Sequence, residues 1–463
     1  MVARHFLDKL RCPACGEAFD MECVVPADGE LIQYGTLHCS CSRYPIVDGI
    51  VILRQHARIM QHLQRADART ALHTALYELV PENSRTRRRQ VLDLLQTFRL
   101  PVGYAAKCDI AWTYRRVTSN ISLTFQQTAQ QLHPPSYANY LTHRFANPSF
   151  QAGIAVLPVL QQLCEPPDEH GKRLSVTAPH ARRPLLDLAC GTAHSSYVIQ
   201  QLFPQLPLVA VDHNFPNLYL AQRFIAPSTT YVYTDLNMPL PFADDAFDGV
   251  FCLDAFHYIE SKLPLVGELT RVVAAHGLWI FPHLHNALAF NESAGLPLSP
   301  EEYLQCFAHL RPRLFPEPYL LDALAKMESL DLALITSEQE LHHTAALCLI
   351  GAQRDNLWQR YDHVLTRLRT NRSALTVNSI YRVTPTPTDF LLELAWPKRQ
   401  RFQRECAAMA AYLPIQERID RMLWERLKQG VTTEADESVI RRLMHCFVLV
   451  PLPPSYATAR ELL

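Results

Sequence analysis

The clearest pattern in the chain is a series of short hydrophobic runs between residues 184 and 285, separated by polar turns and by stretches of helical period. Apolar runs of about four to eight residues, bounded by turn residues, are typical of strands buried on both faces of a parallel sheet. The segments that fit this description are Leu185–Leu188, Leu208–Asp212, Tyr231–Asp235, Gly249–Leu253 and Leu278–Phe281. The pattern therefore predicts an α/β fold built on a Rossmann-like sheet.

The first of these strands leads into a tight turn of small residues, from Ala189 to Ala193. Such a turn lets the backbone approach a ligand at the carboxyl edge of the sheet, and Asp212, about 20 residues further on, can accept hydrogen bonds from ribose hydroxyls. A dinucleotide site needs three glycines against the pyrophosphate, whereas here only Gly191 is a glycine. We therefore expect a nucleoside cofactor that lacks phosphates and carries an amino-acid tail.

This run resembles motif I of the class I S-adenosylmethionine-dependent methyltransferases, and the resemblance extends over residues 184–285. It implies a seven-stranded methyltransferase sheet and S-adenosyl-L-methionine as the cofactor. The cofactor-binding residues that it implies are Asp187, Ala189, Gly191 and Ala193 near the methionine moiety, Asp212 at the ribose, and Asp235 with Leu236 at the adenine. Each of the three aspartates could instead cap a helix or a turn.

The N-terminal segment contains two pairs of closely spaced cysteines, Cys12 with Cys15 and Cys39 with Cys41. Zinc takes thiolates in tetrahedral geometry, and two short turns can supply two thiolates each. We therefore expect a structural zinc site, because a module this small has too little core to be stable alone. The second pair is separated by one residue where two are usual, so His38 and Cys23 stay open as alternative ligands.

The segments Leu10–Cys15 and Leu37–Ile50, which surround these cysteines, resemble the small Trm112-type zinc-ribbon family. The resemblance implies an N-terminal zinc-ribbon module over residues 1–53. A metal-free β-hairpin module with reduced cysteines is the alternative.

The rest of the chain divides by composition and periodicity. The predicted parts are a mostly helical lid or accessory region at 54–164, a linker at 165–183, a methyltransferase core at 184–356 with a helical insertion at about 299–336, and an accessory α+β region at 357–463. Ser299, followed by Pro300 and Glu302, is expected to begin the first helix of the insertion through a capping box.

Candidate groups for the methyl acceptor follow the fourth and fifth predicted strands. They are Asp254, His257, His283 and His285, and neutral histidine is suited to deprotonating an acceptor near pH 7. A histidine and aspartate group at adjacent strand ends could also bind a catalytic metal. Each histidine could equally be a packing residue. Substrate or lid candidates are Tyr137, Tyr140 and His143, in a polar and aromatic stretch before the core.

Composition narrows the class of protein. The formal net charge of −1 provides no global basic field for nucleic acid, and no apolar run is long enough to span a membrane. The 13 cysteines are an odd number and are mostly scattered, which favours reduced thiols and a cytoplasmic protein.

Three functions fit these observations. The first is methylation of an oxygen or nitrogen of a small molecule or peptide, for instance in secondary metabolism. The second is methylation of rRNA or tRNA, for which Arg85–Arg89 and Lys398–Arg401 are the candidate basic clusters. The third is a non-catalytic partner subunit that keeps the fold. No pattern in the chain indicates the oligomeric state.

Overall fold

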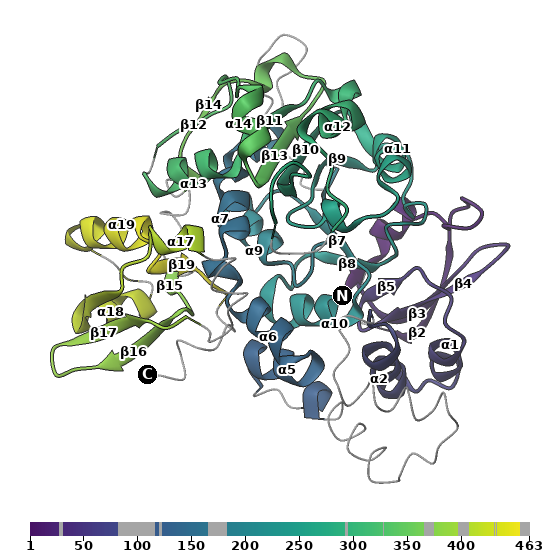
Figure 1. The fold of residues 1–463 in the computed structure, drawn as a ribbon. Helices are drawn as coiled ribbons and strands as arrows, with labels where there is room; N and C mark the ends of the chain where they lie inside the picture. Colours follow the sequence, from purple (N-terminus) through teal and green to yellow (C-terminus); the bar gives the residue numbers. More distant parts are fainter. Residues whose placement is uncertain are drawn as a thin grey trace. The chain divides into compact units, whose positions relative to one another are not determined.

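The computed structural model describes residues 1–26, 31–81, 116–119, 123–164, 183–291, 295–326, 328–364, 375–396, 407–429, 431 and 433–453 (Figure 1). The chain forms two compact units. The first comprises residues 1–142, 191–193 and 209–243, and the second comprises residues 143–190, 194–208 and 244–463. The predicted boundary at residue 53 is therefore not a boundary between units, since residues 1–53 share a unit with part of the predicted core.

A mixed sheet forms the centre of the first unit. Its strands lie in the order β1-β3-β4-β5-β8-β7, with β2 paired to β3. Their bounds are Val2–Ala3 (β1), Asp20–Pro26 (β2), Leu31–His38 (β3), Arg43–Val47 (β4), Ile50–Ile52 (β5), Leu208–Asp212 (β7) and Thr230–Tyr233 (β8).

The junction in this sheet is parallel. Strand β5 pairs with β8, Val51 opposite Val232, and β8 pairs in turn with β7. The cysteine-containing segment is thus continuous with the hydrogen-bonded sheet rather than tethered to it, because its last strand supplies the neighbour that β8 needs.

The described helices of the first unit are short, and the first three of them begin at side-chain N-caps. They are α1 (Ala57–Gln64), α2 (Ala68–Glu78), α5 (Phe125–Leu132), α6 (Pro135–Thr142) and α10 (Phe215–Leu220). Helix α5 begins at a capping box in which Thr124 and Gln127 satisfy each other's backbone N–H groups. The described part of 54–164 is accordingly helical.

The second unit contains the strand that precedes the small-residue turn, together with the parallel strands beside it. Its strand order is β6-β9-β10-β13-β11, parallel from β6 to β10 and antiparallel where β13 meets β10 and β11. The bounds are Leu185–Leu188 (β6), Phe247–Phe251 (β9), Val273–His285 (β10), Arg313–Pro316 (β11) and Ala346–Gly351 (β13). The α/β class with a parallel-rich sheet is therefore confirmed.

The helices of this unit precede and follow its strands along the chain. They are α7 (Pro148–Ala155), α8 (Gln161–Cys164), α9 (His194–Leu202), α11 (Lys262–Val272), α12 (Pro300–Cys306), α13 (Glu317–Ala325) and α14 (Glu338–His343), with short 3₁₀ turns η3 (Arg144–Ala146) and η7 (Phe256–Tyr258). Ser299 begins α12 through the expected capping box with Glu302.

The predicted helical insertion at about 299–336 contains helices α12 and α13, and it also contains a strand. This segment contributes β11, which pairs with β13 along the run from Arg313 to Pro316. A four-residue strand bounded by prolines has too short a period to be distinguished from a loop in the sequence.

The C-terminal region combines strands and helices, as the α+β prediction has it. Strands β16 (Tyr381–Pro385), β17 (Asp389–Leu394) and β18 (Gln416–Asp420) form one antiparallel sheet, and β15 (Leu375–Val377) pairs with β19 (Leu449–Pro451). Helices α17 (Ala407–Ala410), α18 (Arg421–Gln429) and α19 (Glu437–His445) accompany them, and β12 (Leu330–Asp331) pairs with β14 (Arg360–Tyr361) (Figure 1). Among the described residues, no helix has the length and apolar character that crossing a bilayer requires.

Candidate functional site

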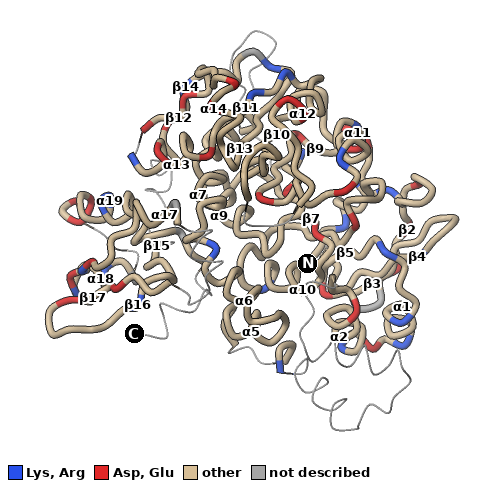
Figure 2. Tube along the Cα trace, in the orientation of Figure 1, with Lys and Arg blue, Asp and Glu red and all other residues tan. Residues whose placement is uncertain are grey.

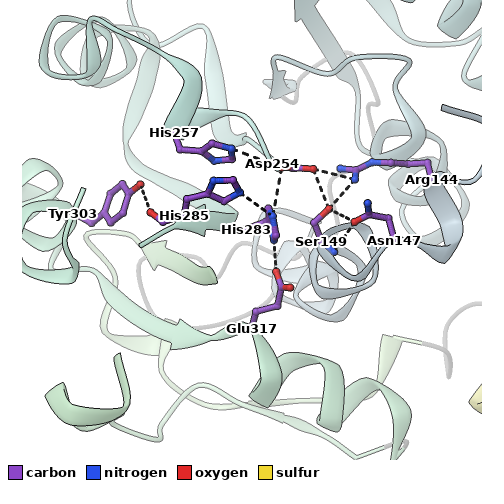
Figure 3. Close-up of polar contacts among 9 residues, drawn as sticks. All are labelled: Arg144, Asn147, Ser149, Asp254, His257, His283, His285, Tyr303 and Glu317. Atoms are coloured by element: carbon purple, nitrogen blue, oxygen red, sulfur yellow. Dashed lines mark hydrogen bonds and ion pairs between the residues drawn. The ribbon is translucent and has the colours of Figure 1, made fainter. Parts of the chain in front are cut away.

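The second unit contains a cluster of acidic, basic and imidazole side chains at the carboxyl ends of β9 and β10 (Figure 3). Asp254 lies three residues after β9, His257 lies in η7, and both His283 and His285 belong to the end of β10. The four predicted acceptor-side residues therefore lie together. The backbone N–H of Asp254 donates to the carbonyl of Pro282 over 3.1 Å, which fixes the two strand ends side by side.

The Asp254 carboxylate is held from one side by two donors. Its Oδ2 accepts a hydrogen bond from Ser149 Oγ at 3.0 Å and lies 3.1 Å from Arg144 Nη1. Ser149 is itself oriented by Asn147, the N-cap of α7, whose side-chain oxygen accepts from the Ser149 N–H and lies 2.6 Å from the Ser149 hydroxyl oxygen. The other carboxylate oxygen, Oδ1, faces the histidines.

The three imidazoles differ in their partners. His283 Nδ1 lies 2.5 Å from Glu317 Oε2 at the start of α13, and its Nε2 lies 3.6 Å from Asp254 Oδ1 and 3.3 Å from His285 Nε2. His257 stacks on His285 with ring centroids 3.5 Å apart. His257 is completely buried, and neither of its ring nitrogens has a hydrogen-bond partner among the described residues.

Burial and charge push the pKa values in this cluster apart. Burial lowers the pKa of His257 to about 3 and that of His285 to about 4. Burial also acts to lower the pKa of His283, but the carboxylates of Glu317 and Asp254 outweigh it and raise that pKa to about 9. Burial alone would raise the pKa of Asp254, yet the charges of His283 and Arg144 bring it well below its usual range.

Two residues of the cluster have a left-handed backbone. Asp254 and His283 both have φ of 57°, a conformation that non-glycine residues seldom adopt. The register of β10 against β13 also shifts between Phe281 and Leu284, so a bulge turns His283 toward the cluster. Non-glycine strain of this kind concentrates at functional sites.

The small-residue turn lies partly in each unit. In the first unit, Gly191 and Ala193 have φ of 56°, and the Gly191 N–H donates to Asp212 Oδ2 over 2.9 Å. Asp212 is buried at the end of β7, and its Oδ1 accepts the N–H of Asn214. Burial raises the pKa of Asp212, the interactions with His213 and with backbone N–H groups opposing it. An addition of a Cβ at Gly191 would meet nothing within 4 Å, so φ and not crowding requires glycine there.

The other predicted cofactor residues differ in their burial and in their hydrogen-bond partners. In the second unit, Asp187 is buried in β6 and accepts a hydrogen bond from Ser196 of α9, and Ala189 has φ of 55°. In the first unit, Leu236 is buried, whereas Asp235 is exposed and its Oδ1 accepts from the N–H and side chain of Asn237.

The substrate or lid candidates have contacts of ordinary packing. Tyr137 and Tyr140 stack with ring centroids 6.0 Å apart, and the Tyr137 hydroxyl accepts from Asn217. His143, in the second unit, has Nδ1 3.4 Å from Ser379 Oγ. The lid role stays a prediction.

The four N-terminal cysteines form a second cluster. Cys12, Cys15, Cys39 and Cys41 have sulfur atoms within 4.8 Å of one another. Three of these distances, Cys12–Cys41, Cys15–Cys39 and Cys39–Cys41, are 3.6, 3.7 and 3.5 Å. Zn–S bonds of about 2.3 Å in tetrahedral geometry place sulfurs about 3.8 Å apart. The four cysteines therefore suit a zinc ion.

The two alternative ligands lie outside this group. Cys23 in β2 has its sulfur 3.9 Å from the carbonyl of Tyr34, and His38 ends β3. The cysteines of the described residues are all free thiols.

Three residues of the acidic and imidazole cluster were not predicted. Ser149 could have been found from the Asn147-Pro148-Ser149 helix start, and Arg144 stands beside the predicted His143. No sequence signal connects Glu317 with His283, which lies 34 residues earlier in the chain.

Residues 186–281 match a family described as methyltransferase domain. A curated relative, malonyl-[acyl-carrier protein] O-methyltransferase of Legionella pneumophila, is 31% identical over 105 residues, which make up 22% of this chain and 37% of the relative. The chain thus spans little more than a third of the length of that enzyme.

Solved structures that are similar to this chain include the two that follow. One is geranyl diphosphate C-methyltransferase from Streptomyces coelicolor, which is 15% identical. The match covers 37% of this chain and 69% of that enzyme, with a TM-score of 0.28. The other is a chain from the complex between the Haloferax volcanii Trm112 methyltransferase activator and a putative methyltransferase. It is 14% identical, and the match covers 37% of this chain and 81% of that chain, with a TM-score of 0.28.

Proposed function

We propose that the chain transfers a methyl group from S-adenosyl-L-methionine to an oxygen or nitrogen of a small molecule or peptide, since residues 186–281 match a methyltransferase domain family. The observation that carries the proposal is the family match together with the buried Asp212 carboxylate bound to the Gly191 N–H. The Legionella relative is an O-methyltransferase, which supports an oxygen acceptor.

The cofactor residues have distinct proposed roles. Asp212 is held by two backbone N–H groups and keeps carboxylate lone pairs for the ribose hydroxyls. The left-handed turn from Ala189 to Ala193 leaves backbone exposed to the methionine end, and Asp187 lies at the end of β6 beside it. Asp235 and Leu236 are proposed to contact the adenine.

The acceptor side rests on the Asp254 cluster. The bound cofactor supplies an activated methyl group, so the protein mainly has to align the acceptor atom with it. Asp254, His257, His283 and His285 combine a carboxylate and imidazoles that can hydrogen-bond an acceptor hydroxyl or amine. Asp254 and His283 remain partly accessible, with 14% and 17% of their side-chain surface exposed.

The cysteine cluster is proposed to hold a structural zinc ion. The sulfur distances suit tetrahedral coordination by Cys12, Cys15, Cys39 and Cys41, and a bound zinc ion would tie together the two turns that carry them. We propose that this segment is a Trm112-like zinc ribbon joined in sequence to its methyltransferase domain.

RNA methylation is the second candidate. Lys and Arg are interspersed with Asp and Glu along the described chain, which does not favour it (Figure 2). The two basic clusters, Arg85–Arg89 and Lys398–Arg401, lie outside the described residues. A non-catalytic partner subunit is the third candidate, and it requires that the cofactor does not bind.

Calorimetric titration of the full chain with S-adenosylhomocysteine tests the proposal. We expect one site per chain, and we expect Asp212→Ala to weaken binding by roughly 10-fold to 100-fold, since a hydrogen bond to a charged group contributes about 1.5–3 kcal/mol. Asp244→Ala, which removes an exposed carboxylate paired with Arg271, is the matched control. Absence of binding to the folded wild-type chain would favour the non-catalytic partner.

A further inference from the structure

The Asp254 cluster has the donor atoms of a metal site. Asp254, His257 and His285 each offer one atom within 4.8 Å of the others, and His283 Nε2 lies 3.6 Å from Asp254 Oδ1 and 3.3 Å from His285 Nε2. Ligand atoms around one transition-metal ion, at bond lengths of about 2.0–2.2 Å, lie about 3–4 Å apart. Shifts of roughly one to two ångströms in the most widely separated side chains would therefore bring the four groups to bonding distance.

One member of the cluster points independently to a missing ligand. His257 is completely buried, yet its two ring nitrogens have no hydrogen-bond partner within the described chain. A buried polar group without a partner is costly and calls for an explanation such as an ion or water. The His257 Nε2 lies 3.9 Å from Asp254 Oδ1, so a cation between the two would satisfy both (Figure 3).

The surrounding contacts have the pattern of an outer ligand shell. Arg144 and Ser149 hold Asp254 Oδ2, which leaves Oδ1 directed to the imidazoles. Glu317 holds His283 Nδ1, which leaves Nε2 directed to the centre. Metal-bound histidines commonly donate their other ring N–H to a carboxylate, which fixes the tautomer and the ring orientation.

We propose that Asp254, His257 and His285 bind a divalent transition metal of the zinc class, with His283 as the fourth ligand. Imidazole nitrogens suit Zn²⁺, Co²⁺ and Fe²⁺, whereas Mg²⁺ and Ca²⁺ prefer oxygen ligands only. On binding, the stacked rings of His257 and His285 must tilt, because each nitrogen lone pair lies in the plane of its ring. This site is separate from the cysteine cluster. It uses the side chains proposed above to face the methyl acceptor, and with a metal bound the acceptor would meet the metal in place of the imidazoles; the binding of the metal itself does not require methyl transfer.

The first test is the metal content of the full chain after dialysis against limiting Zn²⁺. We expect two zinc ions per chain, falling to one in His257→Ala and to one in the double variant Cys39→Ser/Cys41→Ser. His276→Ala removes an exposed histidine from the same strand, β10, and should retain both ions. Circular dichroism verifies that each variant is folded.

The second test identifies the ligands by Co²⁺ absorption. In the double cysteine variant, bound Co²⁺ should give visible d–d bands without the near-ultraviolet thiolate band, and a large excess of Mg²⁺ should leave those bands in place. Glu317→Gln should weaken Co²⁺ binding by about 10-fold to 100-fold.

Contrary results are clear in both tests. One zinc per wild-type chain, lost only with the cysteines, would mean that the cluster is an ionic network without metal. Co²⁺ bands that His257→Ala leaves unchanged would also overturn the proposal. Because neither measurement uses S-adenosylmethionine, failure here leaves the methyltransferase proposal standing.

Discussion

At the scale of single residues, the molecule holds two side chains of its acceptor-side cluster on a strained backbone. Left-handed non-glycine residues cost roughly 1–3 kcal/mol each, and Asp254 and His283 both adopt this conformation. The hydrogen bond from Asp254 N–H to Pro282 and the anchored carboxylate keep them there. Stability is thus given up locally to direct Oδ1 and the imidazoles at one point.

A buried histidine elsewhere makes folding depend on pH. His133, at the end of α5, is fully buried, and burial lowers its pKa from 6.5 to about 3. Between these values the unfolded chain binds a proton that the folded chain excludes, so stability is complete above pH 6.5 and falls as the pH drops. We expect this residue to remove about 2 kcal/mol of unfolding free energy between pH 7 and pH 5.

Urea unfolding at the two pH values measures this loss. His133→Leu should lose less stability than the wild type over the same interval, by about the amount stated above. His276→Gln, in which an exposed histidine is replaced, provides the comparison. An equal loss in wild type and His133→Leu would show that His133 stays solvated.

Individual site residues differ in how far the sequence can predict them. The four acceptor-side residues, Asp254, His257, His283 and His285, lie at or after strand ends. The carboxyl ends of parallel strands lie at the same edge of a sheet, so the proximity of these residues was predictable. The other three residues, Arg144, Ser149 and Glu317, lie in helical elements far from these strand ends in the sequence. No local sequence pattern indicates that these elements pack against the strand ends.

At the scale of elements, helix starts are the most local feature of the fold. The Ser299 hydroxyl accepts from Glu302 N–H, while the Glu302 carboxylate accepts from Ser299 N–H. Both contacts lie within four residues, which is why the start of α12 could be predicted although the nature of the whole insertion could not. The strand β11 owes its existence to β13 and not to its own four residues.

This capping box can be tested directly. Ser299→Ala should lower the free energy of unfolding by about 1 kcal/mol, because the N-terminal N–H groups of α12 lose their acceptor. Ser299→Asp should retain most of the stability, since aspartate is also a good N-cap. Urea denaturation of the three proteins is sufficient. Equal destabilisation by alanine and aspartate would mean that Ser299 acts through packing.

The C-terminal segment illustrates a boundary that periodicity misses. Strand β18 ends at Asp420, and helix α18 starts at the next residue, Arg421. Residues 416–420 pair with β17, so the sheet overrides the helical tendency of a short polar segment.

At the scale of the first unit, the cysteine cluster and the sheet are mechanically connected. Strands β3, β4, β5 and β8 are hydrogen-bonded neighbours in that order. Cys39 and Cys41 lie in the turn between β3 and β4, and Cys12 and Cys15 lie in the segment before β2. Fold class was predictable from hydrophobic runs, whereas this connection was not, because the pairing of β5 with β8 joins segments about 180 residues apart.

Metal removal should therefore be felt in β8. With a chelator and a thiol-binding reagent, we expect faster amide exchange in peptides covering β5 and β8, since loss of the zinc loosens the turns that anchor β3 and β4. Peptides covering β9, in the second unit, are the internal control. Hydrogen exchange with mass spectrometry measures both. Unchanged exchange in β5 and β8 after verified metal loss would contradict the proposed structural role.

The pairing of β5 with β8 has a further consequence for solubility. Strand β8 reads Thr-Tyr-Val-Tyr, a β-branched and aromatic sequence without charge. If β5 were absent, this strand would be an open edge whose unpaired N–H and C=O groups could template intermolecular pairing. The N-terminal segment thus acts as an edge cover, and a chain shortened to its methyltransferase region would be prone to aggregate whatever its catalytic residues.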